Sequence, residues 1–283
     1  MGKFFLILLS CLFFCFSYAS GFSFPGTPTD SIDSLSDRQL LFAVDYLSNK
    51  TYLGRQNTVL EKYVAPSLSY QATSGFFSSI VIDKIVSPEN RFDAAAITAG
   101  WKFNVSKTVE TSLRYSHFIF SKKTIQIISA LRNNIEASFI KEFKWVSPQL
   151  YLDLNFGQGS PDYSIRFEIY HDFEIDNVLT KNNDALIISP TVSISAATLN
   201  FYSVYLRDSS LSRIIRNAAV NVNSKFQLAS VDLALPVEYD IGNFLIRPEI
   251  RQTIPLYQMN NSDNKAVTYF IFTLGYFFMG SNF

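Results

Sequence analysis

Hydrophobic and polar residues alternate along most of this chain. Around residues 149–156, leucines and a phenylalanine hold one set of alternate positions, and Asp153 and Asn155 lie among the others. Successive side chains of a β-strand point to opposite faces of the sheet. The same two-residue period recurs at 163–170 and 231–238. The pattern therefore predicts strands with one apolar face and one face that carries charge.

Reading every such run gives about twelve strands. Most contain about 10 to 14 residues, the length that a tilted strand needs to cross a bilayer. An even number of strands returns both ends of the chain to the same side of the membrane. The expected strands lie near 39–48, 62–72, 75–85, 92–103, 107–120, 133–143, 146–156, 162–174, 185–205, 225–239, 243–256 and 267–278.

The lengths of the connections support this arrangement. If both termini lie in the periplasm, alternate connections are external, where barrel proteins carry their longer loops. Two connections break the rule, because 175–184 is long but periplasmic and 157–161 is short but external. The long external connections are 49–61, 121–132, 206–224 and 257–266, and the tight periplasmic ones are 73–74, 104–106, 144–145 and 240–242.

The composition also fits a membrane-spanning chain. Charged residues make up 17% of the sequence and aromatic residues 16%, whereas a soluble domain has roughly 25% charged residues. After residue 20, no apolar stretch reaches the roughly 18 residues of a spanning helix. Only helices and closed barrels pair every backbone group within a bilayer. The expected fold is therefore all-β, a closed antiparallel transmembrane β-barrel.

The first residues have the features of a secretory signal peptide. Lys3 supplies a positive start, residues 4–16 are almost entirely apolar, and small residues precede a cleavage site after Ala19. Lipidation at Cys11 is the alternative, but it would leave an apolar run directly after the lipidated residue. Both cysteines, Cys11 and Cys15, lie in this segment, so the mature chain would contain no thiol. The expected division is a signal peptide at 1–19, a periplasmic lead-in at 20–37 and the barrel at 38–283.

The last strand carries a resemblance to a known class of proteins. Residues 268–278 alternate apolar side chains and contain Gly275, which resembles the closing strand of bacterial outer-membrane β-barrel proteins. The terminal Phe283 is out of phase with the alternating row, which consists of Phe270, Phe272, Leu274, Tyr276 and Phe278. The resemblance implies recognition by the barrel-assembly machinery. The chain is also similar to mid-sized barrels of Bacteroidota-like bacteria, with no narrower family identified.

The polar faces of the strands supply the first candidate site. A charged lumen that selects small solutes is one interpretation, and a plug of cross-strand ion pairs that conducts nothing is the other. Acidic and basic residues are interspersed, which suits both interpretations. The candidate lumen residues are Glu110, Arg114, Glu136, Asp153, Arg166, Glu168, Asp232, Glu238, Arg247, Glu249 and Arg251.

The external loops supply the second candidate site. Their basic residues are expected to pair with the phosphates of lipopolysaccharide, and a vestibule that attracts anions is the alternative. Two loop segments, 125–131 and 211–215, have apolar residues at helical spacing and could fold inward to constrict a pore. The basic residues of these loops are Lys122, Lys123, Arg132, Arg207, Arg213 and Arg216.

A catalytic site would have to use one of two histidines. His117 lies at the height of an outer-leaflet lipid, so an outer-membrane lipid hydrolase is conceivable. However, Ser116 must face the opposite side of the strand from His117, and no motif specifies Ser138 on the adjacent strand as a nucleophile. The alternative is that both His117 and His171 are interfacial residues of an aromatic belt. We expect no catalytic residues.

The sequence therefore predicts a non-enzymatic outer-membrane barrel, either a narrow channel for small solutes or a structural membrane protein. A surface adhesin acting through residues 206–224 and a soluble periplasmic β-protein are the remaining hypotheses. The expected partners are outer-membrane lipid and lipopolysaccharide. No metal or other cofactor is expected, and the near-neutral net charge gives no reason to expect nucleic acid. The oligomeric state is open.

Overall fold

The computed structural model is one antiparallel sheet that closes into a barrel. It describes residues 39–56, 60–87, 90–122, 124, 126, 129–157, 159–179, 184–201, 225–256 and 265–279. The barrel wall consists of twelve strands. They are β1 (Gln39–Leu47), β4 (Lys62–Gln71), β5 (Phe76–Ser87), β6 (Arg91–Ser106), β7 (Val109–Phe120), β8 (Leu131–Lys141), β9 (Ser147–Gly157), β10 (Asp162–Tyr170), β13 (Thr191–Ala197), β14 (Gln227–Ile241), β15 (Phe244–Pro255) and β16 (Val267–Met279).

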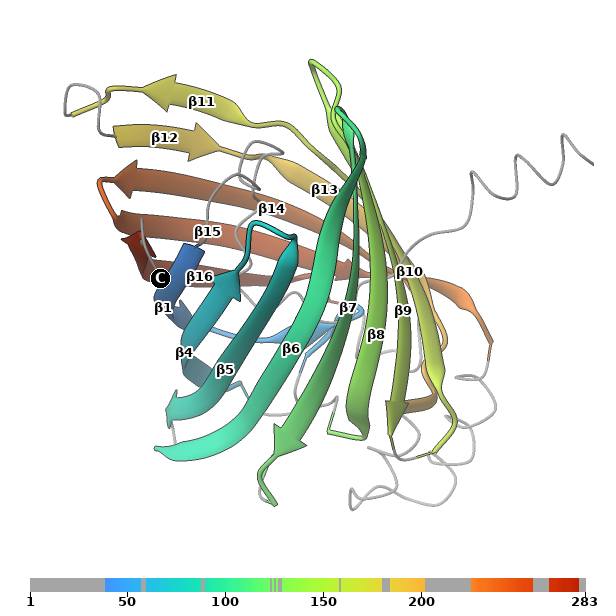
Figure 1. Cartoon of the computed structure of the whole chain (residues 1–283). Helices are drawn as coiled ribbons and strands as arrows, with labels where there is room; N and C mark the ends of the chain where they lie inside the picture. The colour runs from blue at the N-terminus through green and yellow to red at the C-terminus, as the bar shows by residue number, and fades with distance from the viewer. Residues whose placement is uncertain are drawn as a thin grey trace, which may run out of the picture.

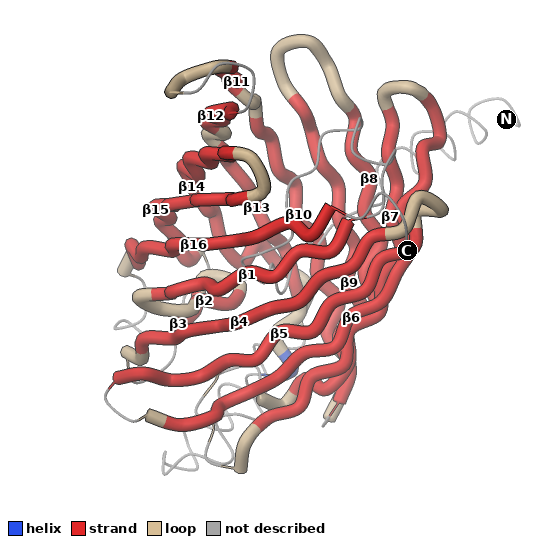
Figure 2. The backbone as a smooth tube through the Cα atoms, turned by 60° about the vertical axis from the view of Figure 1, so that its left-hand side comes forward, coloured by secondary structure: helices blue, strands red, loops and turns tan. Residues whose placement is uncertain are grey.

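The first and last strands close the barrel. β1 pairs with β16 along its whole length, from Gln39 opposite Met279 to Leu47 opposite Ile271. β14 pairs with both β13 and β15, so the ring of strands has no open side. Figure 2 shows β16, β1, β4 and β5 following one another around the wall. Closure confirms the fold expected from the two-residue period.

One hairpin extends the wall on the side of the termini. β11 (Phe173–Asp176) and β12 (Asp184–Ile188) pair with each other, and β12 continues along the end of β14. They lie at the upper left of Figure 1, above β14, β15 and β16. The expectation that 175–184 is a long periplasmic loop was wrong at both ends, because residues 175–176 and 184 belong to strands.

The predicted strand at 185–205 also required correction. It is interrupted after Ile188, resumes in β13 and ends at Ala197. Residues 198–201 leave the wall, and the buried side chains of Leu199 and Phe201 pack with residues of other external connections. Residues 202–205 lie outside the described part of the chain.

The two faces of the wall differ as the alternation predicts. Phe167 on β10 is exposed at 41% and Leu152 shares its outer face, whereas Asp153 faces inward with 4% exposure. Apolar side chains therefore cover the outside and polar side chains line the inside.

Large aromatic residues mark both edges of the apolar wall. Trp101, Phe103, Trp145 and Phe244 are exposed near the end that holds the termini. Phe92, Tyr163 and Phe226 are exposed near the opposite end. An apolar band between two aromatic girdles is the outer surface of a transmembrane barrel, and the protein is a multi-pass β-barrel of the bacterial outer membrane. Barrels of this kind have short turns at the periplasmic end and longer loops outside, so we assign the end with the termini to the periplasm.

Two further observations concern the rest of the chain. Among the described residues, no helix is long and apolar enough to cross a membrane. Residues 1–38 lie outside the described part, so the signal peptide at 1–19 and the lead-in at 20–37 remain predictions.

Candidate functional site

The lumen is lined by charged side chains at many levels. The burial pattern and the strand registers place all the candidate lumen residues, from Glu110 to Arg251, on the inward face. Four of the arginines make ion pairs there. The pairs are Arg114–Glu136 at 2.6 Å, Arg166–Glu168 at 3.4 Å, Arg247–Glu238 at 3.7 Å and Arg251–Glu249 at 2.7 Å. Whether these residues line a route for solutes stays a prediction.

Two carboxylates face each other on the inner wall. Glu136 of β8 and Asp153 of β9 are directly opposite in the strand register. Glu136 is paired with Arg114, whereas Asp153 Oδ1 accepts a hydrogen bond of 2.7 Å from the side-chain amide of Asn134. Asp153 Oδ2 is buried and has no hydrogen-bond partner among the described residues. Two carboxylates therefore share this level of the lumen, and the charges of Arg114 and Arg166 both act on Asp153.

The first external connection folds into the mouth of the barrel. Within residues 48–61, β2 (Thr51–Tyr52) and β3 (Arg55–Gln56) form a short hairpin. Its two turn residues, Leu53 and Gly54, both have positive φ values, 48° and 80°, as a type I′ turn requires. We define residues 51–56 as the mouth hairpin.

Contacts with distant strands show how far the mouth hairpin reaches. A Cβ atom on Gly54 would lie 3.0 Å from the Cα atom of Pro255 at the end of β15. Burial raises the pKa of the Tyr52 hydroxyl well above its usual value, and the carboxylates of Asp162 and Asp153, on β10 and β9, raise it further. The mouth hairpin thus joins parts of the wall that are far apart around the barrel.

An apolar cluster holds the mouth hairpin in place. The rings of Tyr52 and Phe201 meet edge to face, with centroids 4.9 Å apart. Asp162 fixes the segment that carries Phe201, because its carboxylate accepts hydrogen bonds from the backbone N–H groups of Asn200 and Phe201 at 2.6 and 2.7 Å. The cluster contains Tyr52, Leu53, Ala130, Leu131, Ala197, Leu199, Phe201 and Ala229. Three external connections therefore meet inside the mouth.

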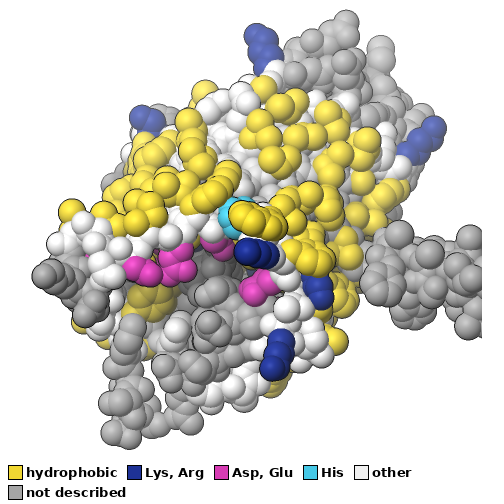
Figure 3. Space-filling view, turned by 90° about the horizontal axis from the view of Figure 1, so that it is seen from above, with side chains coloured by type: hydrophobic (Ala, Val, Ile, Leu, Met, Phe, Trp, Pro, Cys, Tyr) yellow, Lys and Arg dark blue, Asp and Glu magenta, His cyan; other side chains and the backbone are white. Residues whose placement is uncertain are grey.

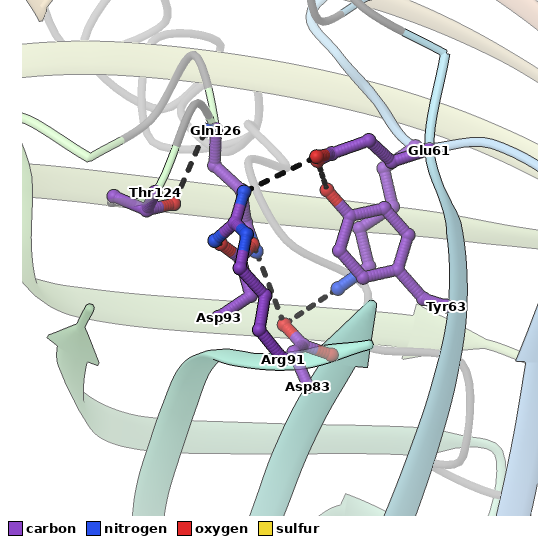
Figure 4. Close-up of polar contacts among 8 residues, drawn as sticks. Glu61, Tyr63, Asp83, Arg91, Asp93, Thr124 and Gln126 are labelled. Atoms are coloured by element: carbon purple, nitrogen blue, oxygen red, sulfur yellow. Dashed lines mark hydrogen bonds and ion pairs between the residues drawn. The ribbon is translucent and has the colours of Figure 1, made fainter. Parts of the chain in front are cut away.

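A polar cluster beside it ties the same connections to the wall. Lys50 binds Asp83 of β5 at 2.5 Å. Arg91 contacts Glu61 at 3.2 Å and Asp93 at 2.9 Å. These side chains converge from β4, β5, β6 and the loops in Figure 4, where Tyr63 donates a hydrogen bond to Glu61.

Gln126 brings the third external connection into this cluster. Its side-chain amide donates hydrogen bonds to Asp93 at 2.6 Å and to Asp83 at 3.5 Å. Gln126 and Leu131 are both buried, so these two residues of 125–131 point into the barrel, while the expected helical segment stays a prediction. Ile125 and Ile128 lie outside the described residues, as does 211–215.

The basic loop residues are only partly described. Lys122 is exposed. Arg132 was expected in a loop, but it belongs to β8, and its guanidinium lies 5.5 Å from the centre of the Phe120 ring. The strand begins two residues earlier than the alternation indicated, because Leu131 still pairs with Gly157. Lys123, Arg207, Arg213 and Arg216 lie outside the described residues.

The geometry separates the histidine from the candidate nucleophiles. His117 is on the outer face, with Nδ1 2.9 Å from Asn133 Oδ1. Ser116 and Ser138 point inward, where their hydroxyls contact Thr98 at 2.8 Å and Ser112 at 2.6 Å. His117 therefore cannot activate either serine in this arrangement.

No family model matches the sequence, and no curated protein matches it. Among solved structures, a KdgM porin is similar with a TM-score of 0.49 and 8% identity, covering 84% of this chain and 98% of that chain. A NanC porin has a TM-score of 0.46 and 9% identity, covering 84% and 98%. LpxR from Salmonella typhimurium has a TM-score of 0.44 and 10% identity, covering 84% and 100%.

None of these matches supports the expected similarity to barrels of Bacteroidota.

Proposed function

We propose that this protein is a narrow channel for small solutes, with the mouth hairpin constricting its external opening. The observation that carries the proposal is the charged inner wall. Replacing buried ion pairs by well-packed apolar residues is often neutral or stabilising. A charged inner wall is therefore of little use for stability alone, whereas it suits a route for water and polar solutes.

A structural membrane protein is the second candidate. The apolar cluster at the mouth and the ion pairs across the strands favour it, because both fill space inside the barrel. The two candidates differ in one respect, which is whether the mouth hairpin can leave the lumen or be removed from it to give a conducting barrel.

Electrical recording in planar bilayers separates these candidates. Residues 51–56 are replaced by a Gly-Ser linker of equal length, and Tyr52→Phe serves as the control that keeps the ring against Phe201. We expect small or intermittent conductance from the wild type and Tyr52→Phe, and larger, steadier conductance from the linker variant. If the linker variant folds and inserts but none of the three proteins conducts, the channel proposal is wrong.

The proposal is for a protein without catalytic activity. The placement of His117 on the outer face and of Ser138 on the inner face supports it. Hydrolysis of phospholipid or lipid A by the pure protein, lost in His117→Ala, would contradict it.

We also propose two partners from the location of the barrel. The apolar side chains of β16, including Phe270 and Leu274, face outward and would be read by the barrel-assembly machinery. Exposed Lys122, with the other basic loop residues, would pair with lipopolysaccharide phosphates. Removing the alternating aromatic residues of β16 is expected to reduce insertion in cells without preventing refolding in detergent.

A further inference from the structure

Charge of one sign predominates inside the described part of the barrel. Inward-facing carboxylates are more numerous than inward-facing basic groups. The acidic residues are Asp45, Glu61, Asp83, Asp93, Glu110, Glu136, Asp153, Asp162, Glu168, Asp232, Glu238, Asp240 and Glu249. The basic residues are Lys50, Arg55, Arg91, Lys102, Arg114, Arg166, Arg247 and Arg251.

Ion pairs with basic side chains account for only some of the inward-facing carboxylates in the described part of the barrel. Most of these basic groups contact a glutamate or aspartate of the wall, as in Arg114–Glu136, Lys50–Asp83 and Arg251–Glu249. Because each such pair removes one positive and one negative charge, carboxylates still outnumber basic groups inside the described part of the barrel. The position of that excess can be read from the hydrogen bonds.

Asp45 and Asp153 are the clearest examples of carboxylates that contribute to this negative charge. Asp45 of β1 is fully buried, and one oxygen accepts a hydrogen bond of 2.6 Å from the Thr273 hydroxyl. Asp153 of β9 is held in the same way by Asn134. In both residues the second carboxylate oxygen is buried and has no hydrogen-bond partner among the described residues. A neutral donor on one oxygen orients a carboxylate without cancelling its charge.

The strand register adds a second observation at Asp153. Its directly opposite neighbour is Glu136, so two carboxylates face each other at one level of the wall. Arg114 makes its ion pair with Glu136, and the charges of Arg114 and Arg166 both act on Asp153. Like charges directly opposite each other destabilise a sheet. A mobile cation in the lumen would relieve that repulsion, and rings of aspartate and glutamate are what cation-conducting pores use.

Figure 3 looks onto the end that carries β11 and β12, where acidic and basic side chains lie near the middle and hydrophobic side chains cover the surrounding wall.

We propose that the lumen carries small cations in preference to anions, and that Asp153 and Asp45 determine this selectivity. The inference rests on the proposed channel function and names its class of solute. Low-dielectric walls concentrate the field of unpaired carboxylates, which raises the local concentration of cations and lowers that of anions.

The test is the reversal potential across a bilayer that separates two KCl concentrations. It is measured for the linker variant of residues 51–56 and for the same protein carrying Asp153→Asn, Asp45→Asn or both. Asp176→Asn is the matched control, because it removes a carboxylate from exposed β11 outside the lumen. We expect K⁺ to be preferred over Cl⁻, and each lumen substitution to lower the permeability ratio by about twofold or more.

The outcomes separate the inference from the function on which it rests. Conductance with Cl⁻ preferred, or a ratio unchanged in the Asp45/Asp153 double variant, would overturn the cation proposal and leave the channel intact. Absence of conductance from a folded, inserted linker variant would overturn both. Proteins are compared only after circular dichroism shows that each variant retains the wild-type β-sheet signal.

Discussion

Glu136 and Asp153 show how one residue pair can serve function at the expense of stability. They face each other at the same level of the wall, yet among the described residues only Glu136 makes an ion pair with a guanidinium. The Asp153 carboxylate therefore adds repulsion that an uncharged side chain of the same shape would avoid. Residues retained at a cost to the fold are candidates for a role in selectivity.

Substitutions at this pair are predicted to change stability in opposite directions. Asp153→Asn keeps the shape, removes the repulsion and places an amide donor opposite Glu136, so we expect the free energy of unfolding to rise by about 0.5 to 1 kcal/mol. Glu136→Gln leaves Arg114 without its carboxylate, so we expect a loss of about 3 kcal/mol. Guanidinium unfolding in lipid vesicles measures both. A destabilised Asp153→Asn would mean that no repulsion exists.

At the scale of the elements, each strand is positioned by its outer face. Leu152 lies at the middle of β9 and faces outward beside Ile165 of β10, whereas Phe244 lies at the periplasmic start of β15. The Leu152 side chain is therefore surrounded by hydrocarbon, and the Phe244 side chain lies at the membrane–water interface. A charged side chain destabilises a barrel much more at the centre of the bilayer than at the interface.

This difference predicts a depth-dependent effect of arginine on the wall. Leu152→Arg is expected to lower the free energy of unfolding by about 2 to 4 kcal/mol, and Phe244→Arg by about 0 to 1 kcal/mol. Both variants are unfolded in vesicles of the same lipid. Equal losses would place Leu152 away from the centre of the bilayer.

The strands could be predicted from the sequence because their signal is local. Leu152 and Asp153 alternate within a single strand, and a period of two needs no knowledge of the partner. Asp45 and Asp83 were missed as lumen residues, since their inward neighbours, such as Leu47 and Ile85, are apolar and hide the alternation. The Glu136–Asp153 juxtaposition depends on register, which no single strand reveals.

The mouth hairpin could not be foreseen for a related reason. Residues 51–56 look like any external loop, and their burial depends on contacts with Phe201 and Pro255, far along the chain. Only Gly54 hinted at a turn. Long-range packing of this kind leaves no periodic trace in a sequence.

For the whole molecule, the excess of carboxylates among the described lumen residues predicts a selectivity that depends on salt. The screening length is about 10 Å at 0.1 M and about 3 Å at 1 M ionic strength. We expect the preference of the linker variant for K⁺ over Cl⁻ to be strong at 0.1 M and to fall toward unity at 1 M. Reversal potentials at fixed concentration ratio give the measurement. A preference independent of salt would indicate selection by size instead of charge.

The hairpin of β11 and β12 fixes how deeply the barrel can sit in its bilayer. β11 has one neighbour in the described sheet, so the N–H and C=O groups on its far edge have no strand to bond with. Such groups are not tolerated in hydrocarbon. The acyl chains must therefore stop near Tyr170, where the wall is last paired on both sides. The side of the barrel that carries β11 and β12 therefore extends beyond the bilayer into the periplasm, and its unpaired edge limits how deeply the barrel can be inserted.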